Sequence, residues 1–149
     1  MIAPRFWVRA GLVALTLLHI TLAIWILLAP RSFFDLKFVN MNMPYNEHLL
    51  LDFGAMNLAP ALMLGVAART MDRRLLRTAL QSALLFWTVH FFIHLRHLHA
   101  MSAANDALLM TALAATVALH LGMLAVAPRA AKQPEVIAAP PAKGETGGA

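Results

Sequence analysis

Four long apolar blocks, separated by short polar stretches, dominate the sequence. They cover residues 10–29, 49–68, 75–95 and 107–127. An α-helix rises 1.5 Å per residue, so about 20 residues cross the roughly 30 Å hydrocarbon core of a bilayer. Lipid offers no partners for backbone polar groups, so blocks of this kind are predicted to be helices. The pattern therefore predicts an all-α protein, an antiparallel four-helix transmembrane bundle.

The second block carries a stripe of small residues around Asn57. Gly54, Ala61 and Gly65 recur at helical spacing on the same face as this asparagine. Small residues let another helix approach closely, and an amide side chain between them bonds across the helices. We therefore expect Asn57 to form an interhelical hydrogen bond. Asn46, just before the block, is predicted to cap the helix N-terminus.

Composition supports a membrane domain over residues 1–128. Hydrophobic residues make up 60% of the chain and charged residues 13%, whereas soluble domains have about a quarter charged residues. Residues 129–149 are rich in Ala, Pro, Gly and Lys, which predicts a disordered cytoplasmic tail. The absence of cysteine excludes disulfides and thiolate metal sites within this chain.

The basic residues are distributed unevenly about the four blocks. Nine Lys and Arg residues lie on the side that holds both termini, and three lie on the other side. Basic residues in short loops favour the cytoplasm. The bias predicts a multi-pass protein of the bacterial plasma membrane with both termini cytoplasmic. No basic stripe interleaved with aromatic residues is present, so nucleic acid is not an expected partner.

Histidines and one carboxylate form the candidate site. His90, His94 and His97 fall within about 60° of one another on an ideal helix, and His48 and Asp52 are four residues apart. The predicted orientation places both groups at the outer face. Antiparallel neighbours joined by a short loop usually pack together, so the two faces are expected to meet.

Three interpretations of this site remain open. Imidazole and carboxylate ligands suit a divalent transition metal such as zinc, copper, iron or nickel. A hydrogen-bonded His–Asp network would instead only hold the second and third helices together. In the third interpretation His97 and His99, and with them His94, simply sit at the lipid headgroups. Acid–base chemistry by these groups is a further possibility.

His19 and His120 are isolated within the first and fourth blocks. Two histidines on different helices can ligate a haem axially. Counting from the block ends places them at different depths, with His120 nearer the inner side. We therefore favour a structural role for each, as a hydrogen-bond partner of a carbonyl, serine or threonine.

The resemblance of this chain to a known group of proteins lies mainly in two segments. They are YNEHLLLDFGAMNL at residues 45–58 and HLRHL at residues 94–98. The chain resembles a group of small four-helix, DoxX-like membrane proteins of actinobacterial type over residues 31–127. The resemblance implies the four-helix fold and supplies no reaction. Members of the group often have a basic residue at the position of Leu51. The leucine in this chain argues against a role that needs a cation beside Asp52. The residues that the resemblance marks as important are His48, Asp52, Asn57, His94 and His97.

Three functions follow as alternatives. The first is a binding or accessory subunit with a His/Asp metal or polar site near the outer face. The second is an enzyme acting on a lipid or isoprenoid, with Asp52 and a histidine as general base and acid. The third is a structural subunit of a membrane complex. The expected partners are the lipid bilayer and either a membrane protein or a second copy of the chain.

Overall fold

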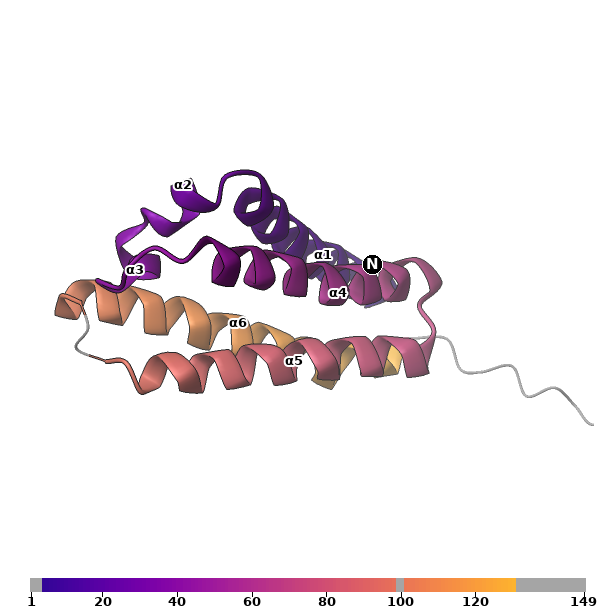
Figure 1. Cartoon of the computed structure of the whole chain (residues 1–149). Coiled ribbons are helices and arrows are strands. Elements are labelled where there is room, and N and C mark those ends of the chain that lie inside the picture. Colours follow the sequence, from indigo (N-terminus) through magenta and orange to yellow (C-terminus); the bar gives the residue numbers. More distant parts are fainter. Residues whose placement is uncertain (1–3, 99–100, 131–149) are drawn as a thin grey trace, which may run out of the picture.

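Four long helices build the protein. The computed structural model describes residues 4–98 and 101–130. The helices are α1 (Pro4–Leu28), α4 (Glu47–Thr70), α5 (Arg73–Leu95) and α6 (Ala103–Ala130). They run antiparallel in chain order (Figure 1), and each is long and apolar enough to cross a membrane. The predicted all-α four-helix bundle is confirmed.

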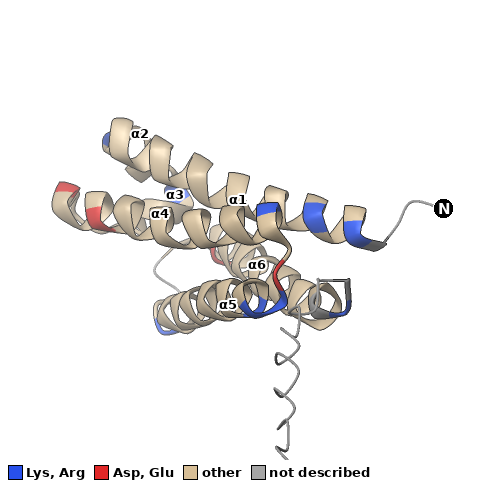
Figure 2. Ribbon diagram, turned by 90° about the vertical axis from the view of Figure 1, so that its right-hand side faces the viewer, with Lys and Arg blue, Asp and Glu red and all other residues tan. Residues whose placement is uncertain are grey.

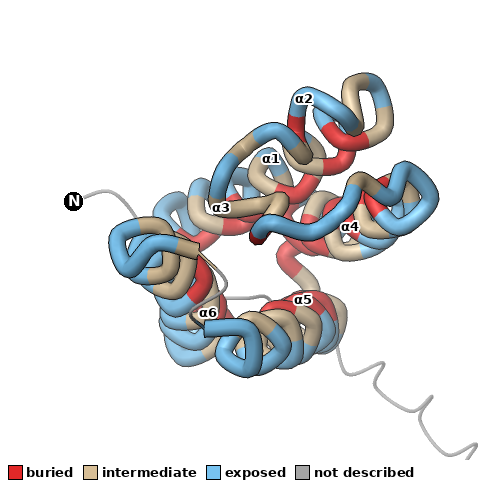
Figure 3. Tube along the Cα trace, turned by 60° about the vertical axis from the view of Figure 1, so that its left-hand side comes forward, coloured by how far each residue is buried: buried red, intermediate tan, exposed pale blue. Residues whose placement is uncertain are grey.

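The helices pack in a ring of two pairs. The most extensive contacts are those of α1 with α4 and of α5 with α6, and smaller contacts join α4 to α5 and α1 to α6 (Figure 3). Two short helices, α2 (Pro30–Phe34) and α3 (Lys37–Asn40), link α1 to α4. Since α2 contacts α1 and α4 while α3 contacts α6, this connection crosses one end of the bundle.

Side-chain caps fix where α4 and α5 begin. Asn46 Oδ1 accepts a hydrogen bond from the backbone N–H of Leu49 at 3.1 Å, so the predicted cap is confirmed. Asp72 Oδ1 accepts one from the backbone N–H of Leu75 at 2.8 Å. Between them, Met71 ends α4 in the left-handed region at φ 54°. This one-residue reversal makes the turn from α4 to α5 very short.

Each helix extends beyond its predicted apolar block. The blocks begin and end on apolar residues, whereas α1 already begins at Pro4 and includes two arginines. At the other end, α6 runs to Ala130. Residues 129 and 130 are therefore helical and do not belong to a disordered tail, while residues 131–149 lie outside the described part of the chain.

The small-residue stripe of α4 faces α1. A Cβ atom placed on Gly54 would lie 3.0 Å from Ile26 Cγ2, and one on Gly65 would lie 3.4 Å from Thr16 Cγ2. The close approach predicted for this stripe is present, and it explains why α1 and α4 form the tightest pair.

Two apolar clusters lie at the two ends of the bundle. The larger cluster joins the N-terminal half of α1 to the C-terminal half of α4, the first half of α5 and the last turns of α6. The smaller one surrounds Ile26, Phe33 and Leu50 near α2. The segment of the bundle between these clusters holds its buried polar side chains.

A candidate polar centre inside the bundle

Each long helix contributes one side chain to a polar cluster, which we call the polar centre. Its members are His19 from α1, Asn57 from α4, Trp87 from α5 and His120 from α6. His19, Asn57 and His120 are fully buried, and Trp87 is 5% exposed. Buried polar groups are costly unless paired, and within helices apolar enough to cross a membrane they commonly mark functional positions.

Hydrogen bonds through His19 join three of the helices. His19 Nδ1 lies 2.9 Å from Asn57 Oδ1, and Trp87 Nε1 lies 3.2 Å from His19 Nε2. An indole nitrogen only donates, so His19 Nε2 accepts and carries no proton. The proton of the neutral ring is then on Nδ1, which donates to Asn57. Asn57 Nδ2 in turn donates to the carbonyl of Phe53 at 2.8 Å, so every polar atom of these side chains is used.

His120 leaves one nitrogen without a partner. Its Nδ1 atom donates to the carbonyl of Thr116, one turn earlier in α6, at 2.8 Å. Its Nε2 atom is buried and has no hydrogen-bond partner. The ring lies edge-on to His19, with the two centroids 5.9 Å apart. The polar centre is therefore complete except for one acceptor, His120 Nε2.

His19 and His120 lie at one depth, contrary to the expectation from residue counting. The count assumed parallel helices with level ends, whereas α1 crosses the bundle obliquely (Figure 1). His120 bonds a backbone carbonyl, as expected, whereas His19 bonds the side chain of Asn57 and not the expected carbonyl, serine or threonine. Their rings contact each other and His19 has no free nitrogen, so the pair does not form an axial haem site.

Above the polar centre, an aromatic face of α5 leads towards the end of the bundle. His90 stacks on Phe53 with the centroids 5.2 Å apart and an interplanar angle of 18°. His94 follows at 4.6 Å from His90, and its Nδ1 atom is buried without a hydrogen-bond partner. His97 is exposed and its Nδ1 donates to the carbonyl of Ile93 at 2.8 Å.

The second predicted ligand group lies on a different surface. His48 Nε2 is 3.5 Å from Asp52 Oδ2, and the two side chains are 88% and 58% exposed. Helix α4 turns its buried face to α1, so it presents Phe53, not Asp52, to His90. Within the described residues, no three histidine or acidic side chains come close enough to hold a metal ion. The structure thus pairs His48 with Asp52 and leaves the three histidines of α5 apart from them.

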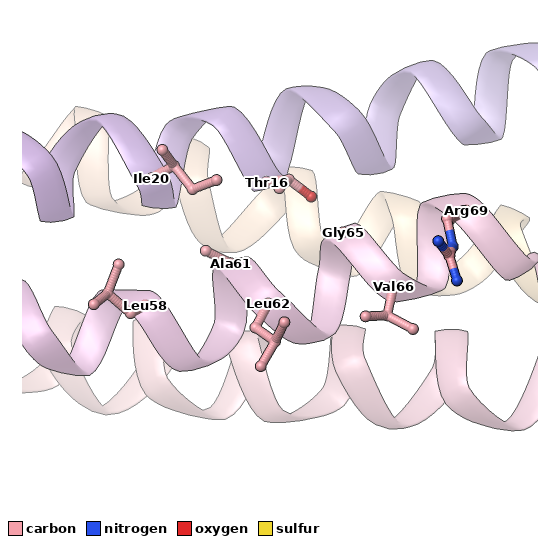
Figure 4. Close-up of a pocket in the computed structure, with 8 residues that line it drawn as sticks. All are labelled: Thr16, Ile20, Leu58, Ala61, Leu62, Gly65, Val66 and Arg69. Carbon is pink, nitrogen blue, oxygen red and sulfur yellow. The ribbon is translucent and has the colours of Figure 1, made fainter.

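An open groove of about 670 Å³ runs along the contact of α1 and α4. Figure 4 shows its lining, which is apolar apart from Thr16 and Arg69. The Thr16 hydroxyl donates to the carbonyl of Leu12, so it is already satisfied. No carboxylate or imidazole lines the groove. The Asp52 and histidine pair expected for a lipid-modifying enzyme is therefore absent from this surface. The lining residues are Thr16, Ile20, Leu58, Ala61, Leu62, Gly65, Val66 and Arg69.

Sequence reasoning missed one member of the polar centre. Asn57 was expected to bond across helices, and His19 and His120 were singled out. Trp87 was not, because a tryptophan inside an apolar block is equally typical of core and lipid contact. A free indole N–H in lipid needs an acceptor, and that requirement was the available signal.

Comparisons with protein-family models, curated proteins and solved structures found no match for this chain.

Proposed function

We propose that the protein is a membrane-embedded binding or accessory subunit whose polar centre takes up a proton at His120. We place it in the bacterial plasma membrane with both termini cytoplasmic, in accordance with its charge bias. The observation that carries the proposal is the buried, unpartnered Nε2 atom of His120. A buried acceptor without a partner costs about 1–3 kcal/mol, so its presence calls for a ligand.

A proton is the ligand that fits this atom. His120 Nε2 is enclosed by the four helices, and a bound water would need a cavity of roughly 10–15 Å³ with several polar partners. A metal ion would need further free ligands, whereas both nitrogens of His19 are already engaged. A proton needs no added space, and imidazole is the side chain that changes charge near neutral pH.

Protonation of His120 would force the polar centre to change. His19 is the titratable group in ring contact with His120, while Asn57 and Trp87 do not titrate. His90 packs on the side chain of Trp87, with the ring centroids 5.7 Å apart. A charged ring inside the membrane costs several kcal/mol unless it is paired. Since His19 Nε2 already accepts from Trp87, the imidazolium can donate to this atom only if the Trp87–His19 bond breaks. Proton uptake is thereby coupled to the contact between α1 and α5.

Trp87 provides a direct signal for this coupling. In protein that carries Trp7→Phe and Trp25→Phe, Trp87 is the remaining tryptophan. We expect its fluorescence emission in liposomes to change reversibly with pH. The titration curve should have the slope that corresponds to the uptake of one proton. The change should disappear in His120→Phe and persist in His90→Phe, a matched control because His90 contacts Trp87 but lies outside the polar centre.

Two outcomes would contradict the proposal. One is constant Trp87 emission over the whole pH range in which the bundle stays folded. The other is a transition that persists in His120→Phe. Nitrogen-15 NMR of histidine-labelled wild-type protein follows His120 Nε2 directly, so the proposal stays testable even where the phenylalanine variant fails to fold.

A further inference from the structure

The groove between α1 and α4 ends at an unpaired cation. Arg69 is exposed, lies one residue before the end of α4, and makes no hydrogen bond or ion pair with any described residue. Nearby, Arg9 of α1 donates from Nε to the carbonyl of Ala68 at 3.0 Å. Figure 2 shows basic residues gathered at this end, along the start of α1 and where α4 passes into α5.

The length of the groove matches one leaflet of a bilayer. Its α4 lining extends from Leu58 to Arg69, which is about 16 Å along the helix axis. That is about half of the roughly 30 Å hydrocarbon core. The groove therefore runs from the membrane boundary at Arg69 to the middle of the membrane, whereas a partner helix would continue through both leaflets.

The lining of the groove suits a hydrocarbon chain. Leu58, Leu62 and Val66 are exposed on its outer wall, while Ala61 and Gly65 form its floor against α1 (Figure 4). A chain lying on small residues gains contact area without competing for hydrogen bonds. The apolar length and the terminal cation therefore match the two parts of a single lipid molecule.

We propose that this groove binds an anionic phospholipid, with one acyl chain along α4 and its phosphate at Arg69. The guanidinium offers charge-assisted hydrogen bonds to phosphate oxygens. This site is separate from the polar centre, so neither proposal depends on the other.

Native mass spectrometry of the full chain in detergent tests the proposal. The probes are phosphatidylglycerol and phosphatidylcholine with identical acyl chains. We expect phosphatidylglycerol to bind about fivefold more strongly, the gain typical of one basic residue at an anionic lipid. Arg69→Gln should remove this preference. Arg74→Gln should keep it, because Arg74 is an exposed arginine at the same end but does not line the groove.

Two further arms separate the lipid from other occupants. Val66→Trp fills the exposed wall and should lower the binding of both lipids, with the melting temperature used to confirm that the variant is folded. Inorganic phosphate should not displace phosphatidylglycerol. Equal binding of the two lipids, an unchanged preference in Arg69→Gln, or displacement by phosphate alone would overturn the proposal. So would a second copy of the chain cross-linked along the groove.

Discussion

His19 Nδ1 lies 2.9 Å from Asn57 Oδ1, and this hydrogen bond joins α1 to α4 in the middle of the bundle. Both side chains are fully buried, so neither has water as an alternative partner. A sliding of α1 along α4 by one turn would leave both groups unpaired. The bond therefore contributes to the register of the two helices, together with the close packing at Gly54 and Gly65.

Replacing Asn57 with leucine should destabilise the bundle. The substitution leaves the His19 Nδ1–H group buried without an acceptor, and interhelical bonds of this kind contribute about 0.6–2 kcal/mol in membrane proteins. We expect the free energy of unfolding in mixed micelles to fall by about that amount. A double-mutant cycle with His19→Phe isolates the pair, because the second substitution should cost less when Asn57 is already absent. Strictly additive losses would show that the two side chains do not interact.

The hydrogen-bond pattern also predicts the tautomer of His19. Trp87 can only donate, so the proton of the neutral His19 ring lies on Nδ1. Nitrogen-15 NMR of histidine-labelled protein should give a protonated Nδ1 and an unprotonated Nε2 signal for this residue. In Trp87→Phe the Nε2 signal should shift as its hydrogen bond is lost, while that of His48 stays constant. A protonated Nε2 in the wild type would mean that Trp87 bonds elsewhere.

The helices of this protein are predictable because apolar blocks long enough to cross a membrane are strongly constrained to pair their backbone groups within a helix. The predicted block at residues 75–95 ends where α5 ends, and the block at 49–68 lies within α4. The cap at Asn46 and the close approach of another helix at Gly54 also follow from the preferences of single residue types at helix ends and helix contacts. These features depend on residues close together in sequence, or on one face of one helix.

The candidate site was harder to predict because it depends on the rotation of each helix. Asp52 and Phe53 are neighbours, yet one is exposed and the other stacks on His90. The two side chains point about 100° apart around the axis of α4, so a rotation of the helix by this angle would bring Asp52 to the position that Phe53 occupies. The packing of α4 against α1 decides between them, and the sequence of α4 does not reveal which neighbour it prefers. The contact of His19 with His120 depends likewise on the oblique course of α1.

Three glycines should respond differently to alanine. In Gly54→Ala the new Cβ atom would lie 3.0 Å from Ile26 Cγ2 and 3.1 Å from Leu27 Cγ, so these side chains of α1 must give way. We expect a loss of about 1–3 kcal/mol, typical of overpacking. Gly65→Ala meets Thr16 at an ordinary 3.4 Å and should cost less. Gly122→Ala meets no atom within 4 Å and should be neutral or slightly stabilising. Thermal unfolding in detergent ranks the three variants, and equal melting temperatures would contradict the packing of α1 on α4.

Transition-metal content should not depend on the His48–Asp52 pair. Two exposed ligands on one helix turn provide fewer donors than the four usual for zinc, and the α5 histidines do not approach them. We expect elemental analysis of purified protein to give the same substoichiometric zinc, copper and iron in the wild type and in His48→Ala. One equivalent of metal that is lost in His48→Ala would restore the outer-face metal site and require α4 to rotate.

The orientation of the bundle can be tested because the chain contains no cysteine. A single cysteine is placed at Met43, in the exposed loop before α4, or at Arg74, in the first turn of α5. The positive-inside bias predicts that an impermeant maleimide labels Met43→Cys on intact cells. Arg74→Cys should react only after the membrane is permeabilised, and denatured samples control for the intrinsic reactivity of each thiol. The reverse pattern would place Arg69 and the basic end of the groove at the outer leaflet. The proton acceptor at His120 would then be approached from the opposite side.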